Sequence, residues 1–155
     1  TLVGQYLGAN NPQMALKALR TAWLFALTFM SAIGIFFLLA PEVIVRLILP
    51  ETDAQASHLI AGAGPLVFIC GIFQPALATT IVMKTCLRGA GATRTVMAWS
   101  FTCLILFRII GITIYDTYFD LTLIKIWTFM SIDLFVQAAL FIAIAFRGKW
   151  LETKV

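Results

Sequence analysis

Two charged side chains lie inside apolar stretches of the sequence. If these stretches cross a membrane, each charge is costly unless it is paired with an opposite charge or has a function such as ion binding. Arg108 interrupts the apolar run 95–115, and Asp133 interrupts the run 126–146. If these runs form two antiparallel membrane-spanning helices, both charges lie about 10 Å below the same boundary, at a rise of ~1.5 Å per residue. Equal depth and opposite sign favour an intramembrane ion pair over an ion or proton relay. Gln137, one turn along from Asp133, could join the same polar patch.

A second group of candidate residues interrupts the run 59–83, which contains no charged side chain but holds Pro65, Gly71, Gln74 and Pro75. Each proline removes a backbone donor and frees carbonyls that lipid cannot satisfy. Such a broken span is typical of a helix that lines a substrate path. The Gln74 amide needs polar partners, so it either faces a substrate cleft, with the glycine and prolines around it, or hydrogen-bonds to a neighbouring helix.

Other residue types that carry chemistry do not form a site. The sequence contains no serine–histidine dyad in a suitable frame, no paired carboxylates within one apolar run and no cluster with metal-ligand spacing. We therefore expect no enzyme activity, no metal site and no cofactor. Cys70, Cys86 and Cys103 lie in or beside apolar runs and are interpreted as buried hydrophobic side chains. His58 stands alone and is expected at a membrane interface.

The composition defines the elements that must position these residues. The chain has 155 residues, of which 61% are hydrophobic and 12% are charged, whereas about a quarter of the residues of a soluble domain are charged. We therefore predict an all-α integral membrane protein embedded in the lipid bilayer. The net charge of +4 comes from basic residues spread through short loops, which indicates membrane-flanking charge and no nucleic-acid partner.

Four apolar runs are long enough to cross a bilayer, and we predict spans at about 21–40, 59–83, 95–115 and 126–146. Asn11 and Pro12 match a helix N-cap and the first helical position. The stretch 41–50 is apolar but short, so it is expected to form an interfacial half-helix or a re-entrant edge. Tryptophans at 23, 99, 127 and 150 lie near predicted span ends, as in an aromatic belt.

Basic residues gather in the segments before the first span, between the second and third, and after the fourth: Lys17, Arg20, Lys84, Arg88, Arg94, Arg147, Lys149 and Lys154. The positive-inside rule places these segments in the cytoplasm. An even number of spans then puts both chain ends on that side. We expect a multi-pass protein of the cytoplasmic (inner) membrane with a cytoplasmic C-terminus.

Several segments resemble multidrug and toxic compound extrusion (MATE) transporters. The segment Leu87–Arg88–Gly89–Ala90–Gly91–Ala92–Thr93–Arg94 resembles the L-R-G-A-G-D-T-R loop of that family. The family's V-G-Q-x-x-G-A-x-x-P stretch and C-terminal pattern are similar to Val3–Gly4–Gln5, Leu7–Gly8–Ala9, Asn11–Pro12, Arg108–Ile109, Ile126–Trp127 and Gly148–Lys149–Trp150.

The resemblance implies a transporter of twelve helices in two six-helix lobes. Residues 1–155 would be the C-terminal portion of the C-terminal lobe, with the end of helix 8 and helices 9–12. It implies multidrug efflux by alternating access, in which sodium ions or protons are exchanged for amphipathic, often cationic, small molecules. The span 59–83 would be helix 10, which lines the central cleft. The chain begins with Thr1 and looks cut from a longer protein, so its partner would be the missing N-terminal lobe.

Two positions depart from the family pattern. Ala92 stands where the family commonly has Asp, so Thr93 is expected to cap the following helix. Some members couple cations through an acidic residue in helix 10, and the span 59–83 has none. The coupling ion, sodium or proton, is therefore expected to bind outside this fragment.

Two alternatives compete with the transporter interpretation. A lipid-linked saccharide flippase of the same superfamily should carry more cationic side chains facing its cleft, and the spans 21–40 and 59–83 have none. A non-transporting four-helix structural membrane protein should have straight, unbroken spans and an initiator Met.

Overall fold

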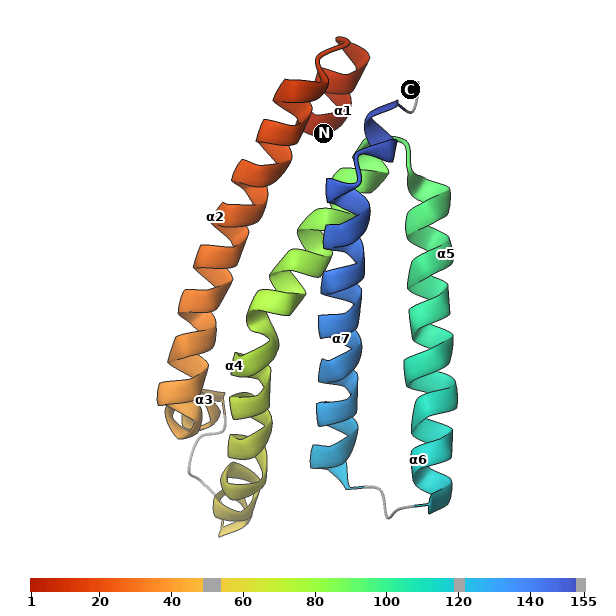
Figure 1. Ribbon diagram of the computed structural model, residues 1–155. Helices are drawn as coiled ribbons and strands as arrows, with labels where there is room; N and C mark the ends of the chain where they lie inside the picture. Colours follow the sequence, from red (N-terminus) through yellow and green to blue (C-terminus); the bar gives the residue numbers. More distant parts are fainter. Residues whose placement is uncertain (49–53, 119–121, 153–155) are drawn as a thin grey trace.

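A computed structural model describes residues 1–48, 54–118 and 122–152 (Figure 1). Every regular element in these ranges is helical. The elements are α1 (Leu2–Gly8), α2 (Pro12–Leu39), α3 (Pro41–Ile48), α4 (Ala54–Gly89), α5 (Thr93–Cys103), the π-helix η1 (Leu104–Gly111), α6 (Ile112–Tyr118), α7 (Leu123–Phe146) and the 3-10 helix η2 (Lys149–Glu152). In Figure 1, α5, η1 and α6 form one continuous rod beside α7.

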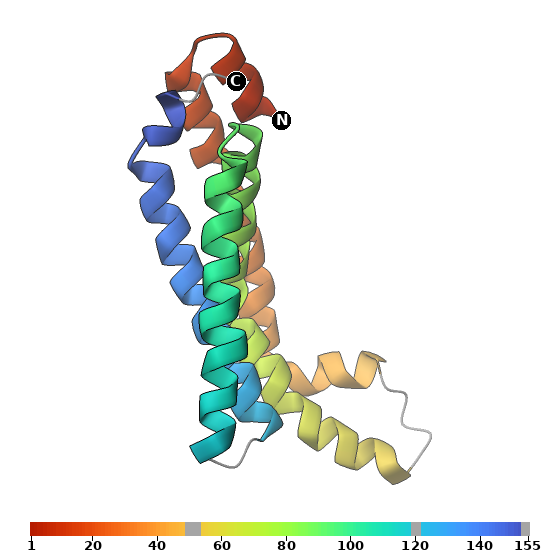
Figure 2. The same ribbon diagram turned by 90° about the vertical axis from the view of Figure 1, so that its right-hand side faces the viewer.

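Four helices are long and apolar enough to cross a membrane: Pro12–Leu39, Gly62–Gly89, Thr93–Tyr118 and Leu123–Phe146. The all-α membrane fold with four such helices is therefore as predicted. The helices extend beyond the charge-free runs because basic residues near a membrane surface still favour helix and carry their charge to water. α1, η2 and the turn between α4 and α5 lie at one end of the bundle in both views (Figures 1 and 2), which we call the terminal end.

The starts of α2 and α5 test two predictions about capping. At α2, Asn11 Oδ1 accepts a hydrogen bond from the Met14 amide at 3.2 Å, and Pro12 follows at the first helical position, as predicted. At α5, Thr93 is already the first helical residue, and Ala92 occupies the cap position without a side-chain hydrogen bond. The prediction that Thr93 caps this helix was wrong, because a capping side chain must come from the residue before the helix.

The segment after α2 behaves differently from the long helices. In Figure 2, α3 projects sideways from the bundle, toward the end opposite the terminal end. Glu42 and Arg46 of α3 are less buried than Val45, which packs inside. This shape is compatible with the predicted interfacial half-helix, whose last residues, 49 and 50, lie outside the described ranges. The side chain of His58 lies outside the described part as well.

The buried core lies at the terminal end. It consists of Val3, Ala15, Leu19, Met83, Leu87, Ala90, Val96, Phe141, Ala145 and Trp150. Elsewhere along the four long helices many large apolar side chains are exposed, including Phe25, Phe29 and Leu106. Exposed apolar side chains on a span are suited to contact lipid or further helices. The helices are thus packed most tightly at the terminal end, where α1, the α4–α5 turn and η2 meet.

Candidate functional site

The charged residues of the two C-terminal spans meet between η1 and α7. Arg108 Nε lies 3.4 Å from Asp133 Oδ2, so the structure brings together the two residues that the depth argument pairs. The Asp133 side chain is fully buried, whereas 42% of the Arg108 side chain is exposed. Asp133 Oδ2 accepts no hydrogen bond within the described residues. Its contact with Arg108 is therefore ionic and longer than a charge-assisted hydrogen bond.

The other carboxylate oxygen belongs to a chain of hydrogen bonds. Gln137 Nε2 donates to Asp133 Oδ1 at 2.8 Å. Lys84 of α4 then donates through Nζ to Gln137 Oε1, and its ammonium also lies 5.1 Å from the centre of the Phe141 ring. Gln137 joins the patch as expected. Three helices therefore meet around one buried carboxylate, which we call the polar network (Lys84, Arg108, Asp133 and Gln137).

Sequence reasoning missed Lys84, because it was counted among the basic residues of a loop. A signal was nevertheless available in the helical period of α4. Thr80 lies one turn before Lys84 and donates from Oγ1 to the Leu134 carbonyl of α7 at 3.4 Å. Leu87 lies three residues after Lys84 and is fully buried. Residues at this spacing share one helix face, so the period places Lys84 on the same face as Thr80 and Leu87, and the structure shows that this face packs against α7.

The local backbone around Arg108 has two unusual features. Arg108 lies in η1, and π-helical turns often occur at functional sites. Gly111 lies three residues later and close to the Phe129 ring of α7. A Cβ at this position would lie 2.6 Å from that ring, so only glycine fits here. This close approach brings η1 near enough to α7 for the arginine to reach Asp133.

The electrostatics of the polar network oppose the binding of a further cation. Lys84 and Arg108 carry two positive charges around the single negative charge of Asp133. A sodium ion at this carboxylate would be repelled by that excess charge. The Gln137 amide between Lys84 and Asp133 has no ionisable proton to pass along. The geometry fits a fixed interhelical ion pair better than a proton relay.

The cleft candidates of α4 lie in different settings. Gln74 is half-buried, and its Oε1 is a buried oxygen without a hydrogen-bond partner in the described residues. Pro75 is half-buried and Pro65 is exposed, and α4 bends along its length in Figure 1, as expected for a helix with internal prolines. Neither of the two described cavities is lined by these residues. The cleft role of Gln74 therefore stays a prediction.

The structure places Gly71 in a contact between two helices, and its expected place beside the cleft stays a prediction. A Cβ on Gly71 would lie 2.8 Å from the Gly34 carbonyl oxygen, and one on Gly34 would lie 2.7 Å from the Gly71 carbonyl oxygen. Pro75 has no amide hydrogen, so it leaves the Gly71 carbonyl without its helical donor. Gly34 of α2 covers that carbonyl, and the two helices pack backbone to backbone here.

A polar contact between α2 and α4 follows about two turns further along α4. Trp23 Nε1 donates to Thr79 Oγ1 at 3.0 Å, and the same hydroxyl donates to the Pro75 carbonyl at 2.8 Å. Trp23 therefore joins two helices as well as lying near a span end. Trp150 is buried and donates from Nε1 to the Ala145 carbonyl at 2.7 Å, so its assignment to a lipid-facing belt was wrong.

The loop motif builds the turn between α4 and α5. Gly91 has a φ of +84°, a left-handed conformation that favours glycine. Gly89 packs its carbonyl against Gly4 of α1 so closely that a Cβ on Gly4 would clash. Arg88 and Arg94 are both exposed on either side of the turn. The glycines thus have a structural role, and the arginines are left at the surface.

Comparison with known proteins identifies the family. The model of the MatE family matches residues 1–114. The chain belongs to the MatE family. No solved structure matches it significantly. Within the described residues of this MatE chain, no group of three or more His, Cys, Asp or Glu side chains could hold a metal ion.

Two curated relatives extend the likeness over the whole MatE chain. A probable multidrug resistance protein NorM of Thermotoga maritima is 32% identical over all 155 residues, which correspond to 32% of its own length. A second protein of that name, from Pseudomonas syringae pv. tomato, is 27% identical over 153 residues and 33% of its length. The chain therefore spans about a third of the length of these relatives.

Proposed function

We propose that the chain forms the C-terminal part of the C-terminal lobe of a multidrug antiporter, with the end of helix 8 and helices 9–12. The transporter would exchange sodium ions or protons for amphipathic, often cationic, small molecules by alternating access. The observation that supports this most is the likeness of all 155 residues to a relative named a probable multidrug resistance protein. The remaining helices, including the N-terminal lobe, would complete the transporter.

Substrate binding in this lobe is assigned to α4. Oε1 of Gln74 is buried without a partner in this conformation, and it would accept a hydrogen bond from an ammonium or amide group of a drug when α4 changes shape and exposes it. A neutral oxygen in an apolar wall suits a range of cationic substrates, because it attracts them without demanding one geometry. Alternating access requires that the two conformations bind substrate or ion with different affinity. The bends at Pro65 and Pro75 supply places where α4 can change shape.

Ion coupling is assigned to the part of the transporter outside this chain. The span 59–83 has no acidic residue, and Asp133 is already compensated by Arg108 and by Lys84 through Gln137. We place the terminal end in the cytoplasm, because the basic segments gather there. The membrane would then be the cytoplasmic membrane.

Transport in proteoliposomes tests this proposal. The intact transporter that carries the chain is reconstituted, ethidium serves as a fluorescent cationic substrate, and a sodium or a proton gradient is imposed separately. We expect one of the two gradients to drive ethidium uphill. If neither gradient moves ethidium, the antiporter proposal is wrong.

The same assay tests the role of Gln74. A lost hydrogen bond of about 1.4 kcal/mol corresponds to a roughly tenfold change in affinity. We therefore expect Gln74→Leu to raise the KM for ethidium by about that factor. Gln13→Leu is the matched control, because Gln13 is exposed at the start of α2. An unchanged KM in Gln74→Leu would remove Gln74 from the cleft and leave the antiport result standing.

A further inference from the structure

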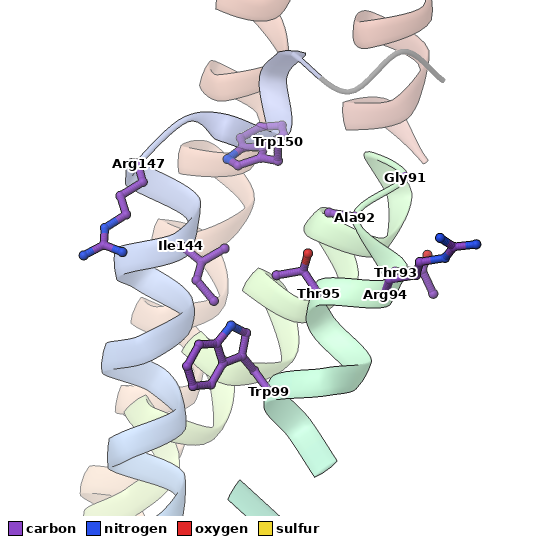
Figure 3. A pocket seen from close by; sticks show the side chains of 9 residues that line it. All are labelled: Gly91, Ala92, Thr93, Arg94, Thr95, Trp99, Ile144, Arg147 and Trp150. Atoms are coloured by element: carbon purple, nitrogen blue, oxygen red, sulfur yellow. The ribbon is translucent and has the colours of Figure 1, made fainter. Parts of the chain in front are cut away.

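A cavity of about 590 Å³ opens at the terminal end, between the start of α5 and the end of α7 (Figure 3). Trp99 and Ile144 line its deeper part, and Trp150 lies above them in the close-up. The Thr95 side chain also lines the space. The cavity is separate from the polar network and from Gln74, since none of those residues lines it.

The mouth of this cavity is positively charged. Among its nine lining residues, Arg94 and Arg147 are cationic and none is acidic. Both arginines are exposed, and Figure 3 shows them on opposite sides of the cavity with their guanidinium groups pointing outward, away from it. Ala92 also lines the cavity, at the position where the L-R-G-A-G-D-T-R loop carries an aspartate. In this chain no carboxylate from that position offsets the arginines.

The cavity lies at the level where the spans leave the hydrocarbon. The candidate span Gly62–Gly89 ends beside it, Thr93–Tyr118 begins at it and Leu123–Phe146 ends at it. This is the depth of phospholipid headgroups, where tryptophan indoles are favoured. Trp99 is 43% exposed and extends the apolar wall away from the mouth. The site therefore has a cationic rim at headgroup depth and an apolar floor on the hydrocarbon side.

We propose that this cavity binds the headgroup of an anionic phospholipid from the leaflet at the terminal end. The exposed arginines can turn toward the mouth and donate hydrogen bonds to phosphate oxygens, for which guanidinium geometry is well matched. The start of the acyl chains would lie along Trp99 and Ile144. The proposal depends on the membrane placement of the spans and is independent of which substrate the transporter moves.

Native mass spectrometry of the intact, delipidated transporter tests the site. The protein is titrated with phosphatidylglycerol or with phosphatidylcholine of the same acyl chains, and the lipid adducts are counted. We expect preferential binding of phosphatidylglycerol. In Arg94→Gln/Arg147→Gln that preference should fall by roughly fivefold per arginine, the usual contribution of one basic residue near an anionic membrane surface. Arg88→Gln is the control, because Arg88 is exposed at the same end but does not line the cavity.

A second pair of variants locates binding inside the cavity without removing any positive charge. Ala92→Asp adds a carboxylate at the cap position of α5, where aspartate favours a helix start, so loss of folding is not expected. It should lower the preference for phosphatidylglycerol, whereas Ala92→Asn, which has the same size without the charge, should keep it. An unchanged preference in Ala92→Asp would overturn the proposal.

Two further outcomes would overturn it. Equal binding of the two lipids by the unchanged protein would show that the headgroup charge is not recognised. Competition by soluble glycerol phosphate at the same concentration as the lipid would show a site for a free phosphate compound instead of a membrane lipid.

Discussion

At the scale of single residues, the polar network is the feature most sensitive to change. Asp133 is fully buried. Its Oδ1 accepts a hydrogen bond from Gln137, and its Oδ2 makes an ionic contact with Arg108. Lys84 completes the network from α4. A buried charge that loses its partner keeps the full cost of its desolvation, whereas removal of both charges releases that cost.

This asymmetry predicts the result of a double-mutant cycle on Arg108 and Asp133. Asp133→Asn and Arg108→Gln should each destabilise the protein, Asp133→Asn by about 3 kcal/mol because it leaves two cations without a counter-charge. The double variant should lose less than the sum, with a coupling of about 1–3 kcal/mol. Unfolding of the purified intact protein by sodium dodecyl sulfate in mixed micelles measures all three values. Additive losses would mean that the two side chains do not stabilise each other.

At the scale of the elements, α4 organises the fold because it packs against α2 on one side and α7 on the other. Gly34 and Gly71 allow the backbones of α2 and α4 to touch. Trp23 and Thr79 then add a hydrogen bond between the same two helices. In lipid there is no hydrophobic driving force between helices. Small residues at such a crossing let the backbones approach closely, so van der Waals packing and hydrogen bonds hold the helices together.

The crossing predicts opposite effects for two glycine substitutions. Gly34→Ala places a methyl group 2.7 Å from the Gly71 carbonyl oxygen, and overpacking of this kind costs typically about 1–3 kcal/mol. Gly62→Ala is the control in α4, because a Cβ there meets nothing within 4 Å; removal of glycine flexibility should stabilise the helix by about 0.5–1 kcal/mol. Thermal unfolding of the two variants measures the difference. A Gly34→Ala protein as stable as the unchanged one would argue against the close contact.

At the scale of the whole molecule, α1, η2 and the α4–α5 turn share one end of the bundle. The described basic residues Arg88, Arg94 and Arg147 lie at that end, and the main cluster of buried apolar residues lies there as well. The arrangement agrees with four antiparallel spans and predicts which loops face the cytoplasm.

Cysteine labelling tests this orientation. In a variant of the intact transporter without native cysteines, Thr122→Cys is placed at the end opposite the terminal end and Thr93→Cys at the α4–α5 turn; both positions are exposed. A membrane-impermeant maleimide added to intact cells should label Thr122→Cys at once. It should label Thr93→Cys only after the membrane is opened. The reverse pattern would invert the orientation.

Hydropathy and residue spacing were enough to predict the all-α membrane fold, the four apolar helices and the pairing of Arg108 with Asp133. The fold and the spans depend on hydropathy within single segments. The ion pair depends on depth in a hairpin of two neighbouring helices, which follows from residue spacing and the helical rise. The cap at Asn11 is of the same kind, because its partner Met14 is three residues away.

Contacts between residues on helices far apart in the chain could not be predicted from spacing. Lys84 meets Gln137 and Gly71 meets Gly34. Each of these contacts depends on how whole helices are rotated and where they cross. At the crossing of α2 and α4, this depends on small residues and on the Gly71 carbonyl that Pro75 leaves without a donor. Arg94 and Arg147 share a cavity for the same reason. Spacing along one helix predicts which face a residue lies on, but the neighbour of that face is chosen by the packing of the bundle.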